Sequence, residues 1–397
     1  ILVINIESFT YPDPWSPYKY GFASEVDHTV RFWVYFLAQG KFYSMFTLLF
    51  GVGFFMFLER LEKKGTGLQA MDLYARRLLW LFLIGVAHAY LIWDGDVLYH
   101  YATCGFLLFP FRSFSVKQLL LVLMVPIGVI LYNSWQSTSS SRLQLTNYEE
   151  AMVVSESERT PEQVAAVEKW ESRIAIGAPD QSAITSPRMT YGESVALNAD
   201  HSKVHRGQIM YPGLFFRTLI MMILGMILYR TGVFSDFRAL PYYWLLTAGL
   251  LVLALTTNYV RYFHWTYQYF EPVTNPVTGW FVSFPKELSG LSYILLLNGL
   301  YQLLAPYLSF NWIRSAGRMA LTNYILQSVI CGVLFYGFVF NMYNGYSRSE
   351  LLAIVLLIWV GQLVFSHFWL RKYSQGPLEN FWRKMTYWPY NKSKDLN

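Results

Sequence analysis

Apolar runs and short basic turns alternate along most of the chain. A helix that crosses a lipid bilayer needs about 20 mostly apolar residues, and that length serves to place the spans. The predicted spans are residues 1–9, 28–58, 78–93, 97–111, 118–133, 211–229, 242–262, 279–304, 319–342 and 351–370. The pattern therefore predicts an all-α, polytopic transmembrane helix bundle of about ten spans, in which residues 1–9 are only the end of the first span.

One long polar stretch, residues 134–208, interrupts this pattern between the fifth and sixth predicted spans. Within it, the run TPEQVAAVEKWESRI predicts a short amphipathic helix, with Thr160 as its N-cap and Pro161 at its first position. We interpret residues 1–397 as a single transmembrane domain and residues 134–208 as a loop inserted into that domain.

The positive charges favour one orientation of the bundle. Short turns and the tail on one side hold 17 of the 31 Lys and Arg residues; these segments are residues 60–77, 112–117, 230–238, 314–318 and the C-terminal tail. The opposite short loops, residues 9–31, 262–278 and 343–350, hold only Lys19, Arg31 and Arg348. Because Lys and Arg concentrate in cytoplasmic loops, we expect both termini in the cytoplasm and residues 134–208 outside.

Composition agrees with a membrane protein and excludes several other classes. The 397 residues are 54% hydrophobic and only 14% charged, whereas a soluble domain carries about 25% charged residues. The net charge of +6 follows the predicted topology, so we expect no nucleic-acid partner. Cys104 and Cys331 lie in apolar runs, and the seven histidines have no spacing typical of a metal site, so we expect no bound metal.

The first candidate site combines two ionisable residues at membrane depth. His88 follows Arg77 by 11 residues, which places it about 16 Å from the basic end of its span and near the middle of the bilayer. Lys41 lies at the same predicted level on the preceding span. Intramembrane ionisable residues are usually functional, although each of these two could also be buried and satisfied locally.

Two carboxylates, Asp94 and Asp96, follow His88 at a predicted turn. Asp96 could simply cap the next helix by accepting backbone N–H bonds. In the functional alternative, one carboxylate holds the ring of His88, or that of His100, in the tautomer that can accept a proton. Tyr101 lies beside His100, and both are predicted to face the same outer vestibule or its wall.

Three further polar residues are candidates for substrate binding. Arg217 lies about 8 Å below the external end of its span, where it could bind a carboxylate or phosphate or extend to the interface. Asn323 and Gln327 are four residues apart and share a helix face. Their alternative function is hydrogen bonding between packed helices.

Four runs of the sequence resemble a known family. GKFYSMFTLLFGVGF, RRLLWLFLIGVAHAYLIWDGDVLYHYA, GRMALTNYILQSVI and GPLENFWRKMTY, in this order, are similar to the DUF418 or YeiB-like family of bacterial membrane proteins. That family is in turn similar to the transmembrane acyltransferases. The resemblance implies about ten helices around a central channel, in the bacterial cytoplasmic membrane, and the use of acyl-CoA from the cytoplasm.

An acyltransferase is the first functional hypothesis. Acyl transfer needs a base and a donor group that stabilises the oxyanion. His88 is the candidate base, Asp94 or Asp96 its orienting partner, and Lys41 the stabilising cation. Acyl-CoA would be the donor, and its phosphates could bind Arg76 and Arg77. The acceptor would be a cell-envelope glycan, a sugar or a lipid-linked molecule.

Two alternatives remain open from the sequence. A transporter or channel for small solutes could use His88, Lys41 and the aspartates as a proton relay. A non-catalytic envelope scaffold would explain the long polar stretch but not the charges at membrane depth. Besides membrane lipids, the partners could include further copies of the chain in an oligomer.

Overall fold

The computed structural model describes residues 1–11, 24–63, 68–175, 190–209, 212–262, 274–336 and 338–392. The regular elements in these ranges are all helices, so the predicted all-α class is confirmed. The α-helices are α1 (Leu2–Thr10), α2 (Glu25–Leu37), α3 (Lys41–Glu62), α4 (Leu68–Leu91), α5 (Leu98–Leu108), α6 (Val116–Val153), α7 (Pro161–Ala175), α8 (Tyr191–Ile209), α9 (Pro212–Arg230), α10 (Tyr243–Tyr262), α11 (Pro276–Phe281), α12 (Pro285–Leu304), α13 (Asn311–Arg318), α14 (Ala320–Phe335), α15 (Arg348–Lys372) and α16 (Pro377–Lys392). Parts of the predicted loops, residues 12–23 with Lys19, 176–189 and 263–273, lie outside the described ranges.

Several of these helices are long and apolar enough to cross a membrane. In the described residues they are Glu25–Leu61, Val116–Val153, Gly213–Arg230, Tyr243–Tyr262 and Arg348–Lys372; α13 and α14, bent by 78°, would add a sixth span. The chain is therefore a multi-pass membrane protein, but these spans do not reach the predicted ten. One reason is length, since α5 has only 11 residues, about 16 Å of helix.

The predicted second span, residues 28–58, lies within the candidate span Glu25–Leu61, which the structure builds from two helices. α2 ends at Leu37, and α3 begins at Lys41 after a turn at Gly40, whose φ of 79° is a conformation that glycine adopts without strain. Lys41 therefore occupies the first position of a helix instead of the middle of one.

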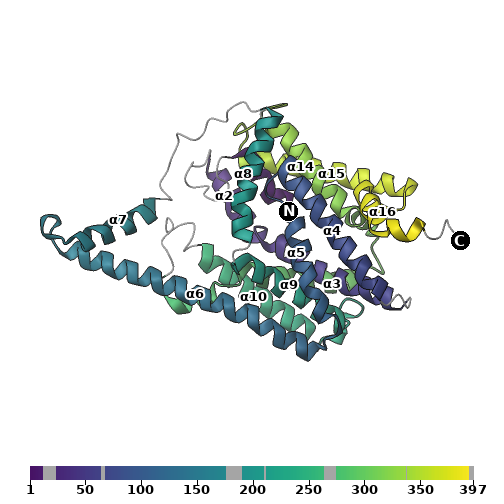
Figure 1. Ribbon diagram of the computed structural model, residues 1–397, viewed down its shortest axis with the longest axis horizontal. Coiled ribbons are helices and arrows are strands. Elements are labelled where there is room, and N and C mark those ends of the chain that lie inside the picture. The colour runs from purple at the N-terminus through teal and green to yellow at the C-terminus, as the bar shows by residue number, and fades with distance from the viewer. Residues whose placement is uncertain are drawn as a thin grey trace.

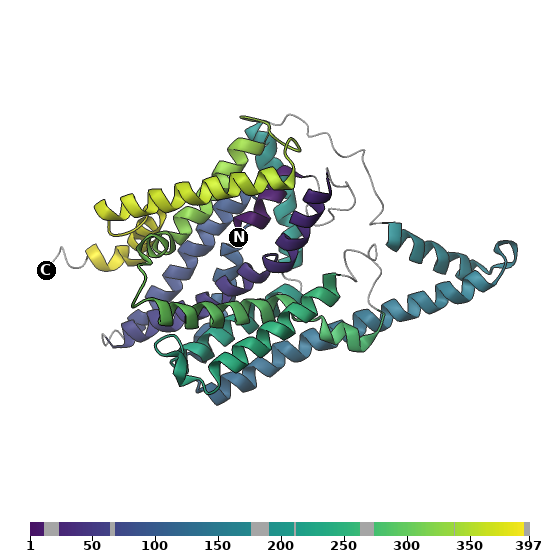
Figure 2. The same ribbon diagram turned by 180° about the vertical axis from the view of Figure 1, so that it is seen from behind.

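The polar stretch 134–208 contains more helix than expected. α6 continues through Ser134 to Val153, and its 38 residues measure about 57 Å. Beyond the bundle, the projecting part of α6 pairs with α7, which folds back beside it (Figures 1 and 2). α7 begins at Pro161, as predicted, and Thr160 Oγ1 accepts a hydrogen bond from the Gln163 N–H at 3.3 Å. α8, by contrast, packs along α4, so part of this stretch belongs to the bundle.

The centre of the bundle is the contact between α3 and α9, where two glycines allow the backbones to meet. A Cβ atom on Gly51 would lie 2.0 Å from the Met222 carbonyl oxygen, and one on Gly225 would lie 2.0 Å from that of Leu48. Small residues commonly allow such close packing of membrane helices. α12 packs on α3 in the same way, because a Cβ on Gly290 would lie 2.5 Å from the Ser44 Cβ.

The bundle has two ends, which we name by their neighbouring residues. At the basic end, α3 ends at Glu62, α4 begins at Leu68 and α9 ends at Arg230. At the loop end, α4 ends at Leu91 while α3, α5, α9 and α12 begin. The candidate residues on α4 and α5 lie toward the loop end.

Candidate functional site

His88 and Asp96 form a buried pair where α4 ends and α5 begins. The His88 Nδ1 atom lies 2.7 Å from Asp96 Oδ2, and the two side chains are 1% and 0% exposed. The other oxygen, Oδ1, accepts the backbone N–H groups of Leu98 at 2.8 Å and Tyr99 at 3.1 Å. Asp96 therefore fits both sequence interpretations, since one oxygen caps α5 and the other holds the histidine.

Gly85 allows α5 to approach α4 closely enough for this pairing. A Cβ atom at Gly85 would lie 2.4 Å from the Tyr99 backbone nitrogen and 2.8 Å from Asp96 Oδ1. Real Cβ atoms do not come this close to other atoms, so a larger residue would displace the start of α5.

The ring nitrogen of His88 that does not contact Asp96, Nε2, is available to accept a proton. When Asp96 is ionised, it accepts a hydrogen bond from the Nδ1–H group of His88, which leaves the lone pair on Nε2. Nε2 is buried and has no hydrogen-bond partner in the described residues, and neither has the Tyr324 hydroxyl. The ring centroids of His88 and Tyr324 are 5.2 Å apart. An oriented imidazole with a free Nε2 is the arrangement that a general base requires.

A second buried histidine, His100, belongs to a hydrogen-bonded chain. Its Nε2 lies 2.8 Å from Thr218 Oγ1, which is also 2.7 Å from the Tyr43 hydroxyl. The Thr218 hydroxyl uses its single hydrogen to donate to the Leu214 carbonyl oxygen at 2.9 Å. Its oxygen therefore accepts hydrogen bonds from both His100 and Tyr43. The Nδ1 atom of His100 is then the unprotonated one, and it has no partner in the described residues.

Tyr101, the neighbour of His100, contacts a different part of α3. Its hydroxyl donates to the Tyr43 carbonyl oxygen at 3.3 Å, and its ring lies 5.5 Å from that of Tyr43. Tyr101 thus fixes α5 against α3.

The two predicted catalytic aspartates contact different histidines. Asp94 Oδ2 lies 3.1 Å from His201 Nδ1 on α8, and this histidine is 52% exposed. In the described contacts Asp96, not Asp94, is therefore the carboxylate that orients His88.

Lys41 and Arg217 lie away from His88 in the contacts that the structure describes. Lys41 is 1% exposed as a residue, and its ammonium group donates a hydrogen bond to the Tyr35 carbonyl at 2.8 Å. Arg217 pairs with Glu287 of α12 at 3.0 Å. Lys41 thus belongs to the junction of α2, α3 and α12, and the described contacts do not place it over the His88 ring.

Asn323 and Gln327 form a hydrogen-bonded network between α14 and α15. Asn323 Nδ2 donates to Ser366 Oγ at 3.0 Å, and Gln327 Nε2 donates to Gln362 Oε1 at 2.7 Å. Gln362 in turn donates to the Asn323 carbonyl at 2.8 Å. This geometry matches the interhelical alternative stated for these residues.

Arg76 and Arg77 have protein partners at the basic end. Arg76 pairs with Asp72 at 2.6 Å, one turn earlier on α4. The Arg77 guanidinium lies 4.0 Å from the centre of the Trp382 ring and 4.9 Å from that of Phe57, and the Trp382 indole N–H donates to the Arg77 carbonyl. Arg77 therefore fastens α16 to α3 and α4.

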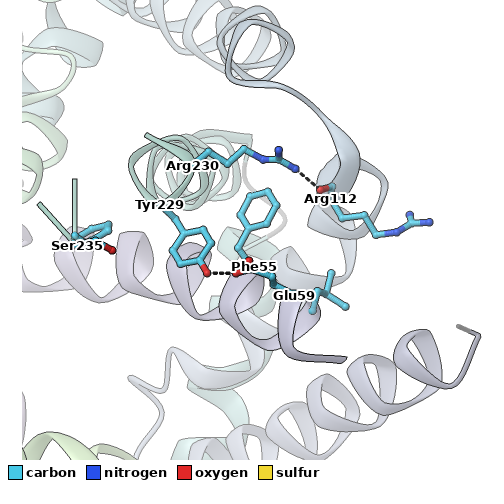
Figure 3. A pocket seen from close by; sticks show the side chains of 8 residues that line it. Phe55, Glu59, Arg112, Tyr229, Arg230 and Ser235 are labelled. Carbon is cyan, nitrogen blue, oxygen red and sulfur yellow. Dashed lines mark hydrogen bonds between the residues drawn. The ribbon is translucent and has the colours of Figure 1, made fainter. Parts of the chain in front are cut away.

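A pocket of about 420 Å³ lies elsewhere at the basic end, between α3, η2 (Phe109–Ser113) and α9. It is lined by Phe55, Leu58, Glu59, Arg112, Tyr229, Arg230, Phe234 and Ser235. Figure 3 shows Arg230 extended to the Arg112 carbonyl, to which it donates at 2.6 Å, and the Tyr229 hydroxyl bonded to Glu59. In the sequence, Arg112 and Arg230 indicated only the orientation of the bundle in the membrane.

Three residues of the site were not predicted from the sequence: Tyr324, Thr218 and Tyr43. Tyr324 and Thr218 directly follow the predicted residues Asn323 and Arg217. Successive residues of a helix point about 100° apart. The polar residues Asn323 and Arg217 therefore did not show that their neighbours, on another face of the helix, contact the histidines.

The fold and this site define a multi-pass helical membrane protein with a buried histidine–carboxylate pair. Residues 228–389 match the family described as "Protein of unknown function (DUF418)". The chain is 28% identical to "Uncharacterized protein YxaH" of Bacillus subtilis (strain 168), over 98% of this chain and 90% of the relative. It is also 28% identical to "Uncharacterized protein YeiB" of Escherichia coli (strain K12), over 97% of this chain and 92% of the relative. No solved structure matches the chain. The DUF418 match over residues 228–389 and the similarity to YxaH and YeiB over nearly the whole chain agree with the resemblance that the sequence runs predicted.

Proposed function

We propose that this protein is a membrane acyltransferase in which His88 is the general base. The observation that carries the proposal is the buried His88–Asp96 pair, with Nδ1 held at 2.7 Å and Nε2 unpartnered. A buried polar atom without a partner is costly, so its retention at membrane depth favours a reaction at that atom.

In the proposed reaction, a hydroxyl or amine of the acceptor attacks the thioester carbonyl of acyl-CoA. The new C–O or C–N bond forms as the acceptor proton moves to His88 Nε2, and Asp96 stabilises the resulting imidazolium. The C–S bond then breaks, and the thiolate of CoA takes the proton from Nε2. The Tyr324 hydroxyl, next to the ring, is the candidate donor to the oxyanion.

The proposed orientation places the basic end in the cytoplasm of a bacterial cell, with both termini inside and about ten crossings of the cytoplasmic membrane. Arg112 and Arg230, which line the pocket at that end, are the candidates for binding CoA phosphates, because Arg76 and Arg77 do not line it. The acceptor, a glycan or lipid-linked molecule of the envelope, would enter from the loop end.

The test is acyl-CoA-dependent release of thiol by the purified protein in detergent, with envelope extract as the source of acceptor and acyl chains from acetyl to palmitoyl. We expect His88→Gln to lower the rate by at least about 100-fold, since general bases typically contribute 10²–10⁴-fold. His367→Gln is the matched control, because His367 stacks on Trp312 at 4.1 Å and lies on α15. Equal rates for His88→Gln and the control, or no thiol release by the wild-type protein, would contradict the proposal.

A proton-coupled transporter is the second candidate, favoured by the chain of His100, Thr218 and Tyr43. Two buried histidines with open nitrogen atoms could pass a proton along this chain. Proton uptake by protein-containing liposomes without acyl-CoA, abolished by His100→Gln, would favour this function over acyl transfer.

A further inference from the structure

Two lysines, Lys41 and Lys286, lie near each other at the loop end, and neither has a carboxylate partner in the described residues. The side chain of Lys286, on α12, lies across Gly40, the residue before Lys41; a Cβ atom at Gly40 would be 2.3 Å from Lys286 Cδ. In the described residues neither lysine forms an ion pair, and Lys41 hydrogen-bonds only a backbone carbonyl.

Both lysines also stand at the wrong end of a helix for a cation. Lys41 is the first residue of α3, and Lys286 is the second residue of α12. The start of a helix carries partial positive charge and unpaired N–H groups, which attract anions and repel cations. Neither start is capped by a side chain, since the N-cap residues are Gly40 and Phe284.

The carboxylate beside them in the described residues is Glu287, which already pairs with Arg217 at 3.0 Å. Lys41 is buried and Lys286 is partly buried. Holding like charges together out of water is unfavourable unless an anion lies between them. Helix N-termini combined with lysines are a common arrangement for binding phosphate groups.

We propose that Lys41, Lys286 and the starts of α3 and α12 bind the phosphate group of a ligand that enters from the loop end. Arg217 contacts Glu287 beside this site, and Thr218, its neighbour in α9, contacts His100. Gly40 is required because its missing side chain lets the Lys286 stem pass close to the start of α3. The ligand is either a phospholipid headgroup or a soluble phosphate, and the site does not depend on acyl transfer.

The soluble arm of the test measures the apparent melting temperature of delipidated protein in neutral detergent, titrated with inorganic phosphate against chloride at equal ionic strength. We expect phosphate to stabilise the wild-type protein and Lys286→Gln to weaken phosphate binding at least tenfold. Lys117→Gln, an exposed lysine beside the start of α6, is the matched control and should bind as wild type. The lipid arm compares nanodiscs of phosphatidylglycerol with nanodiscs of phosphatidylcholine, using the same three proteins.

Glu287→Gln keeps the proposal testable if Lys286→Gln does not fold. Removal of this carboxylate frees Arg217 for the ligand, so the affinity for phosphate should increase; a purely structural cluster would only lose stability. Stabilisation in one arm that Lys286→Gln removes supports the site and identifies the source of the phosphate. No preference for phosphate or for anionic lipid in either arm overturns the site, as does a Glu287→Gln protein that binds no better than wild type.

Discussion

Polar residues are buried to a similar degree in two regions of this protein, but they are satisfied differently. Between α14 and α15, Asn323 and Gln362 are 7% and 6% exposed, and their amide groups bond to each other's helix. At α4 and α5, His88 and His100 are each 2% exposed, and each has one ring nitrogen bonded and one without a partner in the described residues.

The difference separates polar residues that build the fold from those that can react. A closed network uses its hydrogen-bonding atoms on neighbouring helices, and each bond contributes about 0.5–1.5 kcal/mol to stability. An open buried atom costs about 1–3 kcal/mol, so it needs another explanation. Burial of a polar residue in a membrane helix is therefore weak evidence for function, whereas a buried atom that lacks a partner is stronger evidence.

The largest effect is expected from Asp96→Asn, which changes the open region without removing the cap. The amide oxygen can still accept the Leu98 and Tyr99 N–H groups, but the amide NH₂ then faces His88 Nδ1. The imidazole must adopt the tautomer that carries its proton on Nε2, so Nε2 can no longer accept a proton from the acceptor. We expect acyl transfer to fall by about 10³–10⁴-fold, as in other histidine–aspartate pairs.

The measurement is the rate of thiol release, together with the apparent melting temperature in detergent. A nearly unchanged melting temperature would show that the cap is retained. An active Asp96→Asn protein would mean that Asp96 is only a helix cap.

Gly85→Ala should act on the same pair through the backbone. The added methyl group would lie 2.4 Å from the Tyr99 nitrogen, so α5 must move and the His88–Asp96 distance must increase. Because small displacements of catalytic groups reduce rates strongly, we expect a loss of about 10–100-fold in rate and a lower melting temperature. Gly128→Ala is the control, since nothing lies within 4 Å of that position. Equal behaviour of the two variants would show that the contact of α4 with α5 is not required.

Gln362→Leu tests the closed network. The substitution removes the bonds to Gln327 and to the Asn323 carbonyl and leaves those groups without partners. We expect a loss of about 1–3 kcal/mol in stability, with normal activity in the protein that remains folded. The check is denaturation in detergent beside the rate of thiol release. A catalytic defect at normal stability would place this network in the reaction and remove the contrast between the two regions.

Part of this organisation could be predicted from the sequence. Helix signals are local, so the all-α class and the start of α7 at Pro161 followed from apolar length and a capping residue. The two interpretations of Asp96 were also available, because its position before α5 and its distance from His88 along the chain are local features.

Other features depended on packing that no local pattern encodes. The turn at Gly40 breaks the helix inside the candidate span Glu25–Leu61, and it moves Lys41 to a helix start. The return of α8 to the side of α4, and the meeting of Tyr324 with His88, are contacts between segments far apart in the chain. Residue spacing cannot specify such contacts: it placed Lys41 at the level of His88, whereas the hydrogen bond that Lys41 makes goes to the Tyr35 carbonyl.

The smallest effect is expected from Asp94→Asn, and it sharpens the distinction between the two aspartates. Asp94 pairs with His201, which is 52% exposed, and exposed ion pairs contribute about 0–1 kcal/mol. The substitution removes one charge from a partly exposed contact, in which the Asp94 side chain is 18% exposed, and it leaves the His88–Asp96 pair untouched. We therefore expect the rate of thiol release to stay within about twofold of wild type and the melting temperature to change little, whereas Asp96→Asn nearly abolishes activity. If Asp94→Asn instead reduced the rate as much as Asp96→Asn, the contact of α8 with α4 would have to be part of the catalytic site, and the open region would extend to the surface of the bundle.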